Sequence, residues 1–113
     1  MAYDLEKRTT DFAKRVIRMC SVLPRNAVNA RLSGQVVGSA GSIGANYREA
    51  NDSLGKKDFI LRMRIARKEA KESLHWLELV VEANKPLSKR MEKLIQENIG
   101  LKNILSAIIT KSL

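Results

Sequence analysis

His75 is the only histidine of the 113-residue chain, and it stands in the one stretch whose residue types could support catalysis. Glu69, Glu72, His75 and Glu78 recur at spacings of three, which place side chains on one side of a helix. The Glu72–His75 spacing is that of di-metal helical bundles, but those sites need two such pairs and two further carboxylates. Both residues also lie outside the apolar stripe of their helix. The sequence therefore predicts no catalytic residue, no metal and no cofactor, and a metal-dependent enzyme is the disfavoured alternative.

Four helices are expected to position these residues. Apolar side chains recur at alternating spacings of three and four, with no strand-like alternation between them. Asp4 and Asn29 are the expected N-caps of the first two helices, Pro24 ends the first, and Pro86 fits the first turn of the last. Because the connections are short, the chain is predicted to be one all-α domain, an up-down-up-down four-helix bundle. The expected helices span residues 4–23, 29–51, 56–84 and 86–113.

The second helix is rich in small residues and nearly uncharged. Its three glycines between residues 38 and 44 each weaken a helix by roughly 1 kcal/mol relative to alanine. A phosphate-binding loop is disfavoured, since neither a Gly-Lys-Ser/Thr ending nor a G-x-G-x-x-G spacing is present. Close approach of a neighbouring helix or subunit is the simplest compensation for that cost. The residues expected at helix-packing or subunit contacts are Gly41, Ile43, Gly44, Tyr47 and, from the third helix, Trp76.

Cysteine usage and hydropathy indicate the cellular location. One cysteine excludes an internal disulfide bond and fits a reducing compartment. The first residues are mixed and charged rather than typical of a signal peptide, and no run of about 18 apolar residues occurs. We therefore expect a cytoplasmic protein without a membrane partner.

The charge points to a polyanionic partner. The chain carries 21 basic and 12 acidic residues, a formal net charge of +9, which favours contact with structured RNA or DNA. The third helix changes from +5 over residues 56–71 to −3 over residues 72–84, against the preference of the helix dipole. In an up-down bundle, Arg18, Arg25 and Arg31 should lie near Lys85, Lys89 and Arg90, at the end opposite residue 56. The sequence therefore predicts two basic areas, one toward each end of the bundle. The expected nucleic-acid contacts are Lys14, Arg15, Arg18, Arg25, Arg31, Arg62, Arg64, Arg67, Lys68 and Lys71.

Several strings resemble one known family. Ser42-Ile-Gly-Ala-Asn-Tyr-Arg-Glu-Ala50 and Lys56-Lys-Asp-Phe-Ile60 are together similar to the four-helix-bundle family named after the intervening sequences of 23S ribosomal RNA. Accessory proteins of diversity-generating retroelements belong to the same family. The resemblance covers most of residues 3–84, and the last helix matches only in pattern. The further matching strings are Tyr3-Asp-Leu-Glu6, Ala66-Arg-Lys-Glu-Ala-Lys-Glu72 and His75-Trp-Leu-Glu-Leu79.

The resemblance implies an assembly and a function. Members are bacterial bundles that form barrel-shaped homopentamers, and the retroelement members bind nucleic acid and a reverse transcriptase through basic surface. No catalytic residues are established in the family. The expected function is therefore a non-catalytic, basic, oligomeric nucleic-acid-binding protein, accessory to a ribosomal RNA intervening sequence or to a retroelement reverse transcriptase. The alternative is a scaffold or adaptor whose basic face docks an acidic protein partner, and binding of naked RNA separates the two.

Overall fold

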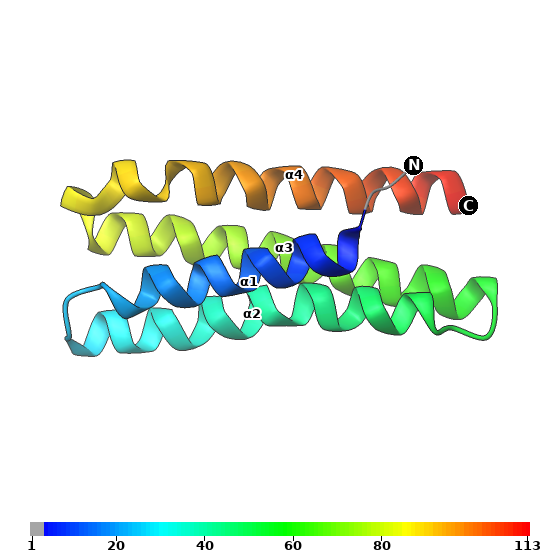
Figure 1. The fold of residues 1–113 in the computed structure, drawn as a ribbon, viewed down its shortest axis with the longest axis horizontal. Coiled ribbons are helices and arrows are strands. Elements are labelled where there is room, and N and C mark those ends of the chain that lie inside the picture. Colours follow the sequence, from blue (N-terminus) through cyan, green and yellow to red (C-terminus); the bar gives the residue numbers. More distant parts are fainter. Residues whose placement is uncertain (1–3) are drawn as a thin grey trace.

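The fold is an elongated bundle, seen side-on in Figure 1. The computed structural model describes residues 4–113, so Tyr3, which begins one of the matching strings, lies outside the described residues. The bundle measures 45 × 25 × 19 Å. The described part contains helices and no strands. The elements are α1 (Leu5–Ser21), α2 (Ala27–Asn51), α3 (Lys56–Ala83), the 3-10 turn η1 (Lys85–Leu87) and α4 (Ser88–Ser112).

The four helices pack as a ring of neighbours. Helix α2 is adjacent to α1 and α3, and α4 is adjacent to α3 and α1. The diagonal pairs have no Cα atoms within 8 Å of each other in residues 4–113. The α1–α2 loop and the α3–α4 connection lie at one end of the bundle, which we call the α1/α2-loop end, and the α2–α3 connection lies at the other (Figure 1). The predicted all-α class and four-helix bundle are confirmed.

Side-chain caps mark the starts of α1 and α2, whereas α3 and α4 begin without one. The backbone N–H of Lys7 donates to the Asp4 side chain at 3.0 Å, so Asp4 caps α1 as expected. Asn29 was the expected cap of α2, but the helix begins two residues earlier. There Asn26 has an extended backbone, and its side chain accepts from the Asn29 N–H at 2.8 Å. Pro86 was expected in the first turn of the last helix, but it lies in η1, the 3-10 turn that precedes α4.

The expected apolar stripes meet along the bundle axis. Most buried side chains form one main core contributed by all four helices. A second, smaller cluster at the α1/α2-loop end contains Leu23, Val80 and Met91. Among residues 4–113, no helix has an apolar stretch long enough to cross a membrane. The largest fully buried apolar side chains are Phe12, Ile43, Met63, Leu77, Met91, Leu101, Leu105, Val16, Val36 and Val80.

Buried asparagine side chains link neighbouring helices through hydrogen bonds. Asn29 of α2 and Asn84, the residue that ends α3, exchange two amide hydrogen bonds of 2.9 and 2.8 Å. Between α3 and α4, the Ser73 hydroxyl donates to Asn98 at 2.6 Å, and the Asn98 amide donates to the Ala70 carbonyl at 2.8 Å. Every buried side-chain polar atom of the described residues has a partner. Asn29 therefore links two helices instead of capping one.

Close helix approach explains one of the three glycines. A Cβ atom added to Gly44 would lie 2.8 Å from Thr9 Oγ1, so α1 and α2 cross closely there. Gly38 and Gly41 are exposed, and an added Cβ would meet nothing within 4 Å. The expectation that Gly41 packs against a helix of this chain is therefore wrong, because it lies on the outer face of α2. Its role in a contact between copies stays a prediction.

The other residues expected at packing contacts lie in or beside the core. Ile43 is fully buried in the main core. Tyr47 and Trp76 are half-buried, and both pack against that core from its edge. Each of these three side chains is therefore held by helices of the same chain.

Candidate nucleic-acid interface

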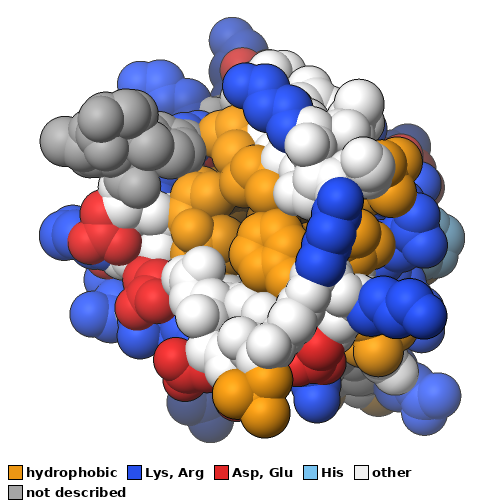
Figure 2. Space-filling view, turned by 90° about the vertical axis from the view of Figure 1, so that its right-hand side faces the viewer, with side chains coloured by type: hydrophobic (Ala, Val, Ile, Leu, Met, Phe, Trp, Pro, Cys, Tyr) orange, Lys and Arg blue, Asp and Glu red, His pale blue; other side chains and the backbone are white. Residues whose placement is uncertain are grey.

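The basic half of α3 presents a stripe of cations to solvent. Helix α3 buries the face that carries Met63 and Ala70. On the opposite face Arg64, Lys68 and Lys71 recur at spacings of four and three, and all three are exposed. We call these three residues the α3 stripe. It lies in the part of α3 toward the α2–α3 connection. Figure 2 views that end of the bundle, where Lys and Arg side chains, with Asp and Glu side chains at the left and bottom of the view, lie around a central group of hydrophobic side chains.

The same face of α3 changes sign along its length. Beyond Lys71 its exposed residues are His75, Glu78, Leu79 and Glu82. Glu82 forms an ion pair with Lys85 at 3.6 Å. The charge reversal expected from the sequence thus lies on one exposed face, and a polyanion would be attracted to the half that carries the α3 stripe.

Few of the expected contacts are neutralised within the chain. Arg62 forms an ion pair with Asp58, one turn earlier on α3, with 3.9 Å between Nε and Oδ1. None of the other nine expected residues forms an ion pair in the described part of the chain. Arg67 is half-buried. Cations without an intramolecular carboxylate partner keep their charge available for phosphate groups.

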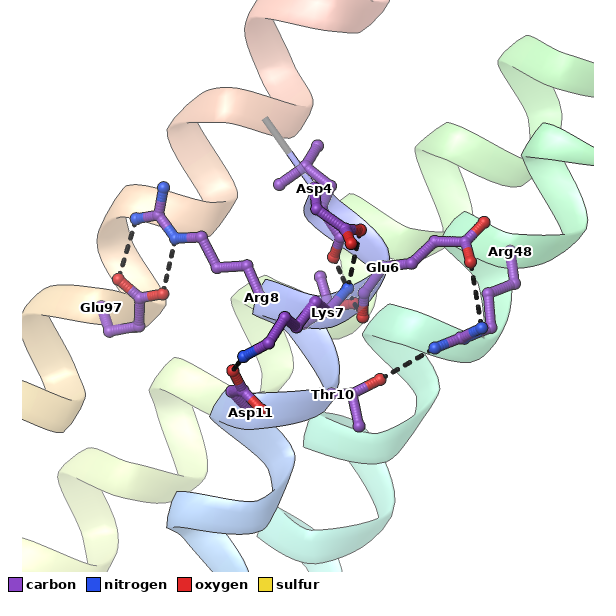
Figure 3. Close-up of polar contacts among 10 residues, drawn as sticks. Asp4, Glu6, Lys7, Arg8, Thr10, Asp11, Arg48 and Glu97 are labelled. Atoms are coloured by element: carbon purple, nitrogen blue, oxygen red, sulfur yellow. Dashed lines mark hydrogen bonds and ion pairs between the residues drawn. The ribbon is translucent and has the colours of Figure 1, made fainter. Parts of the chain in front are cut away.

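Two other arginines form ion pairs with carboxylates of neighbouring helices and are not available for phosphate groups in the same way (Figure 3). Arg8 of α1 donates two hydrogen bonds to Glu97 of α4, from Nε to Oε2 at 2.7 Å and from Nη2 to Oε1 at 2.8 Å. These bonds raise the pKa of Arg8 above its ordinary value. Arg48 of α2 pairs with Glu6 of α1 at 3.0 Å. We assign these two arginines a structural role.

The expected contacts on α1 and α2 are dispersed. Lys14 and Arg18 are exposed on α1, and Arg15 is half-buried beside a cleft of about 420 Å³ between α1 and α4. Arg25 is exposed in the α1–α2 loop, and Arg31 is exposed on α2. The ten expected residues therefore do not form one patch. Arg18, Arg25 and Arg31 belong to the α1/α2-loop end, and residues 62–71 lie toward the other end, so two basic areas exist as expected.

A pocket joins Arg18 to a residue of α4. Arg18 and Arg90 both line a pocket of about 280 Å³ between the end of α1 and the start of α4. The sequence predicted that Arg18 and Arg90 lie at the same end, but it offered no sign of a cavity between them. We call it the Arg18–Arg90 pocket. Its remaining lining residues are all apolar, namely Met19, Val22, Leu23, Leu87 and Met91.

The four residues considered for catalysis, Glu69, Glu72, His75 and Glu78, do not come together in one site. His75 is exposed, its ring lies 5.1 Å from that of the adjacent Trp76, and Glu72 is half-buried. Burial, with a smaller effect of Glu72, raises the pKa of Glu69. Within residues 4–113, no group of three or more His, Cys, Asp or Glu side chains could hold a metal ion. Cys20 is a half-buried thiol whose pKa is raised by burial.

The sequence and the fold of the chain both match known proteins. The sequence model of the 23S rRNA-intervening sequence protein family matches residues 2–107. A crystal structure of a protein of unknown function from the S23 ribosomal protein family of Bacteroides thetaiotaomicron superposes with a TM-score of 0.81. The two sequences are 31% identical, over 93% of this chain and 94% of that chain. Comparison with curated proteins gives no match.

Proposed function

We propose a function for this protein, which belongs to the 23S rRNA-intervening sequence protein family. It is a non-catalytic accessory protein that binds structured RNA or DNA. Binding would proceed through phosphate contacts, which position a nucleic acid without reading its sequence. The observation that carries the proposal is the α3 stripe, three exposed cations without ion-pair partners in the described residues.

The geometry of the α3 stripe suits a phosphate backbone. From Arg64 to Lys71 the helix axis rises about 10 Å, at about 1.5 Å per residue. One strand of a DNA duplex presents about three phosphates over that distance, at about 3.4 Å of axis per phosphate. Three cations can therefore face three phosphates of one strand. The second basic area, at the α1/α2-loop end, would extend the contact to other parts of a folded RNA.

The proposed nucleic acid takes one of two forms. One is ribosomal RNA that carries an intervening sequence. The other is the RNA of a diversity-generating retroelement, in which case a reverse transcriptase is a further proposed partner. We propose the cytoplasm as its location, because both proposed partners act there. The genes that flank its own gene distinguish the two forms.

Self-association is part of the proposal. The exposed face of α2 carries Gly34, Gly38, Gly41 and Ala45, and none of the three glycines contacts another helix of the chain. Small residues on an exposed helix let a second helix approach closely, which would offset a helix-propensity cost of about 1 kcal/mol per glycine. A barrel-shaped homopentamer is the proposed assembly. Light scattering should then give about five times the chain mass of 12.7 kDa, and a monomer at micromolar concentration would refute it.

The salt dependence of RNA binding tests the α3 stripe. In the test variant, Arg64, Lys68 and Lys71 are each replaced by glutamine, which keeps the side-chain length and helix propensity. Removal of a single cation–phosphate interaction should reduce the slope of log affinity against log salt by about 0.7–0.9. The three substitutions together should flatten the slope by about 2 and weaken binding strongly at low salt.

A matched variant removes the same charge from scattered sites. Lys56 and Lys111 are exposed, Lys102 is half-buried, and none of the three forms an ion pair in the described part of the chain. Their replacement by glutamine should change the slope and the affinity much less. Equal weakening by both variants would mean a diffuse attraction with no defined site. If the parent protein binds neither RNA nor DNA at low salt, the nucleic-acid proposal fails and the adaptor with an acidic protein partner becomes the better explanation.

A further inference from the structure

The Arg18–Arg90 pocket combines two cationic side chains with an apolar lining. Phosphate contacts alone would need only the cations. Its two arginines come from different helices, α1 and α4, while its other five lining residues are apolar. Its volume of about 280 Å³ lies just below the range of about 300–1,000 Å³ typical of pockets for whole small-molecule ligands. The pocket thus suits one compact apolar group joined to an anion.

The surroundings of the pocket are strongly basic. Residues 18–31 contain three arginines and no acidic residue, and residues 82–93 contain four basic and two acidic residues, so these segments together carry +5. Neither Arg18 nor Arg90 forms an ion pair in the described part of the chain. Asp11, two turns before Arg18 on α1, is itself hydrogen-bonded to Lys7. Anionic ligands are therefore favoured over cationic or neutral ones.

The apolar lining suits an aromatic ring. Met19 and Met91 contribute thioether groups, which make favourable contacts with aromatic rings and adapt to their shape. Val22 forms an exposed part of the rim, with 56% of its surface accessible, and Leu23 and Met91 belong to the second core cluster beneath. Guanidinium groups bind phosphate through paired hydrogen bonds and stack on base planes.

We propose that the Arg18–Arg90 pocket receives the base of a single unpaired nucleotide of the bound RNA, while Arg18 and Arg90 hold the phosphates on either side of it. The inference rests on the proposed RNA binding and adds a preference for one structural feature, a bulged or looped-out nucleotide. Proteins that recognise RNA specifically use such splayed nucleotides, because the deep major groove of an RNA helix is closed to side chains.

Two RNA hairpins that differ in one base provide the test. Both have the same stem and a one-nucleotide bulge, which is an adenosine in one hairpin and an abasic ribose in the other. Their phosphates are identical, so binding through phosphates alone cannot separate them. The parent protein should bind the adenosine hairpin about tenfold more tightly, a value within the range measured for single-base stacking contacts.

A pair of protein variants then locates the base. Val22 and Val28 lie at the same end of the bundle with similar exposure, 56% and 59%, and only Val22 lines the pocket. Val22→Glu should abolish the preference for the adenosine hairpin. Val28→Glu makes the same charge change and should keep that preference. Both variants should be compared with the parent in thermal melts, since each substitution is at an exposed position and should preserve the fold.

Each outcome decides the proposal. Equal binding of both hairpins by the parent overturns the base pocket while the phosphate-binding function stands. A preference that survives in Val22→Glu shows that the base binds elsewhere and also overturns it. If the parent binds neither hairpin at low salt, the proposed RNA binding fails and the pocket assignment falls with it. If Val22→Glu does not fold, the fluorescence of 2-aminopurine at the bulge should change when the parent binds, and an unchanged signal refutes the proposal.

Discussion

Replacing Gly44 by alanine should destabilise the bundle, although helix propensity alone favours the change. The new Cβ would lie 2.8 Å from Thr9 Oγ1 and 3.3 Å from Thr9 Cβ. Thr9 is fully buried, and its hydroxyl donates to the Leu5 carbonyl at 2.7 Å. Because a β-branched side chain has few allowed rotamers in a helix, Thr9 cannot swing away freely. Helices α1 and α2 must therefore separate slightly to accept the methyl group.

The expected magnitude is the difference of two opposing effects. Alanine gains about 1 kcal/mol of helix propensity over glycine, and overpacking a well-packed site costs about 1–3 kcal/mol. The net loss in the free energy of unfolding should reach about 2 kcal/mol, or a lower melting temperature by about 4 °C per kcal/mol. Gly38→Ala is the matched control on the same helix. Inside the chain its Cβ would meet nothing within 4 Å, so in the monomeric state, where no second copy packs on that face of α2, it should stabilise by up to about 1 kcal/mol.

Urea denaturation of a double-mutant cycle measures the contact directly. Thr9→Ala removes the hydroxyl and the methyl group that the new side chain would meet. In that background, Gly44→Ala should cost at least about 1 kcal/mol less than in the parent, a coupling within the usual range for touching residues. All variants must be compared in the same association state by light scattering. If Gly44→Ala stabilises as much as Gly38→Ala in both backgrounds, the close crossing of α1 and α2 is refuted.

Two further predictions concern a buried asparagine and a half-buried glutamate. Asn84→Ala would remove the donor to the buried Asn29 Oδ1, while Asn29 Nδ2 would still donate to the Pro24 carbonyl. It should lower the free energy of unfolding by about 1–3 kcal/mol in urea titrations, whereas Asn103→Ala, at an exposed site on α4, should change it little. Burial raises the folded-state pKa of Glu69, so its ionised form destabilises the fold above that pKa, and the penalty disappears as the pH falls below the unfolded-state pKa. Glu69→Gln should therefore melt at a higher temperature than the parent at neutral pH, and the two melting temperatures should converge in acid; a difference independent of pH would contradict this account.

The helices could be predicted because their signals are local. Apolar residues at spacings of three and four, the Asp4 cap and the two prolines placed all four helices within two residues of their observed ends. The basic segments and the charge reversal along α3 were equally visible, since charge is a property of composition. The failure at Asn29 also has a local cause. Asn26 and Asn29 are both good capping residues, and the sequence alone does not choose between them.

The sequence by itself determined the helices, the bundle class and the two basic areas, since the periodicity of the chain and its charged residues fix these without reference to distant neighbours. Tertiary structure alone decided which residues meet. The Arg8–Glu97 pair joins residues 89 positions apart, and the Asn29–Asn84 pair joins residues 55 apart. The Gly44–Thr9 crossing and the Arg18–Arg90 pocket likewise depend on how two helices are rotated and shifted against each other. Packing of whole side-chain surfaces sets that rotation, and no short stretch of sequence encodes it.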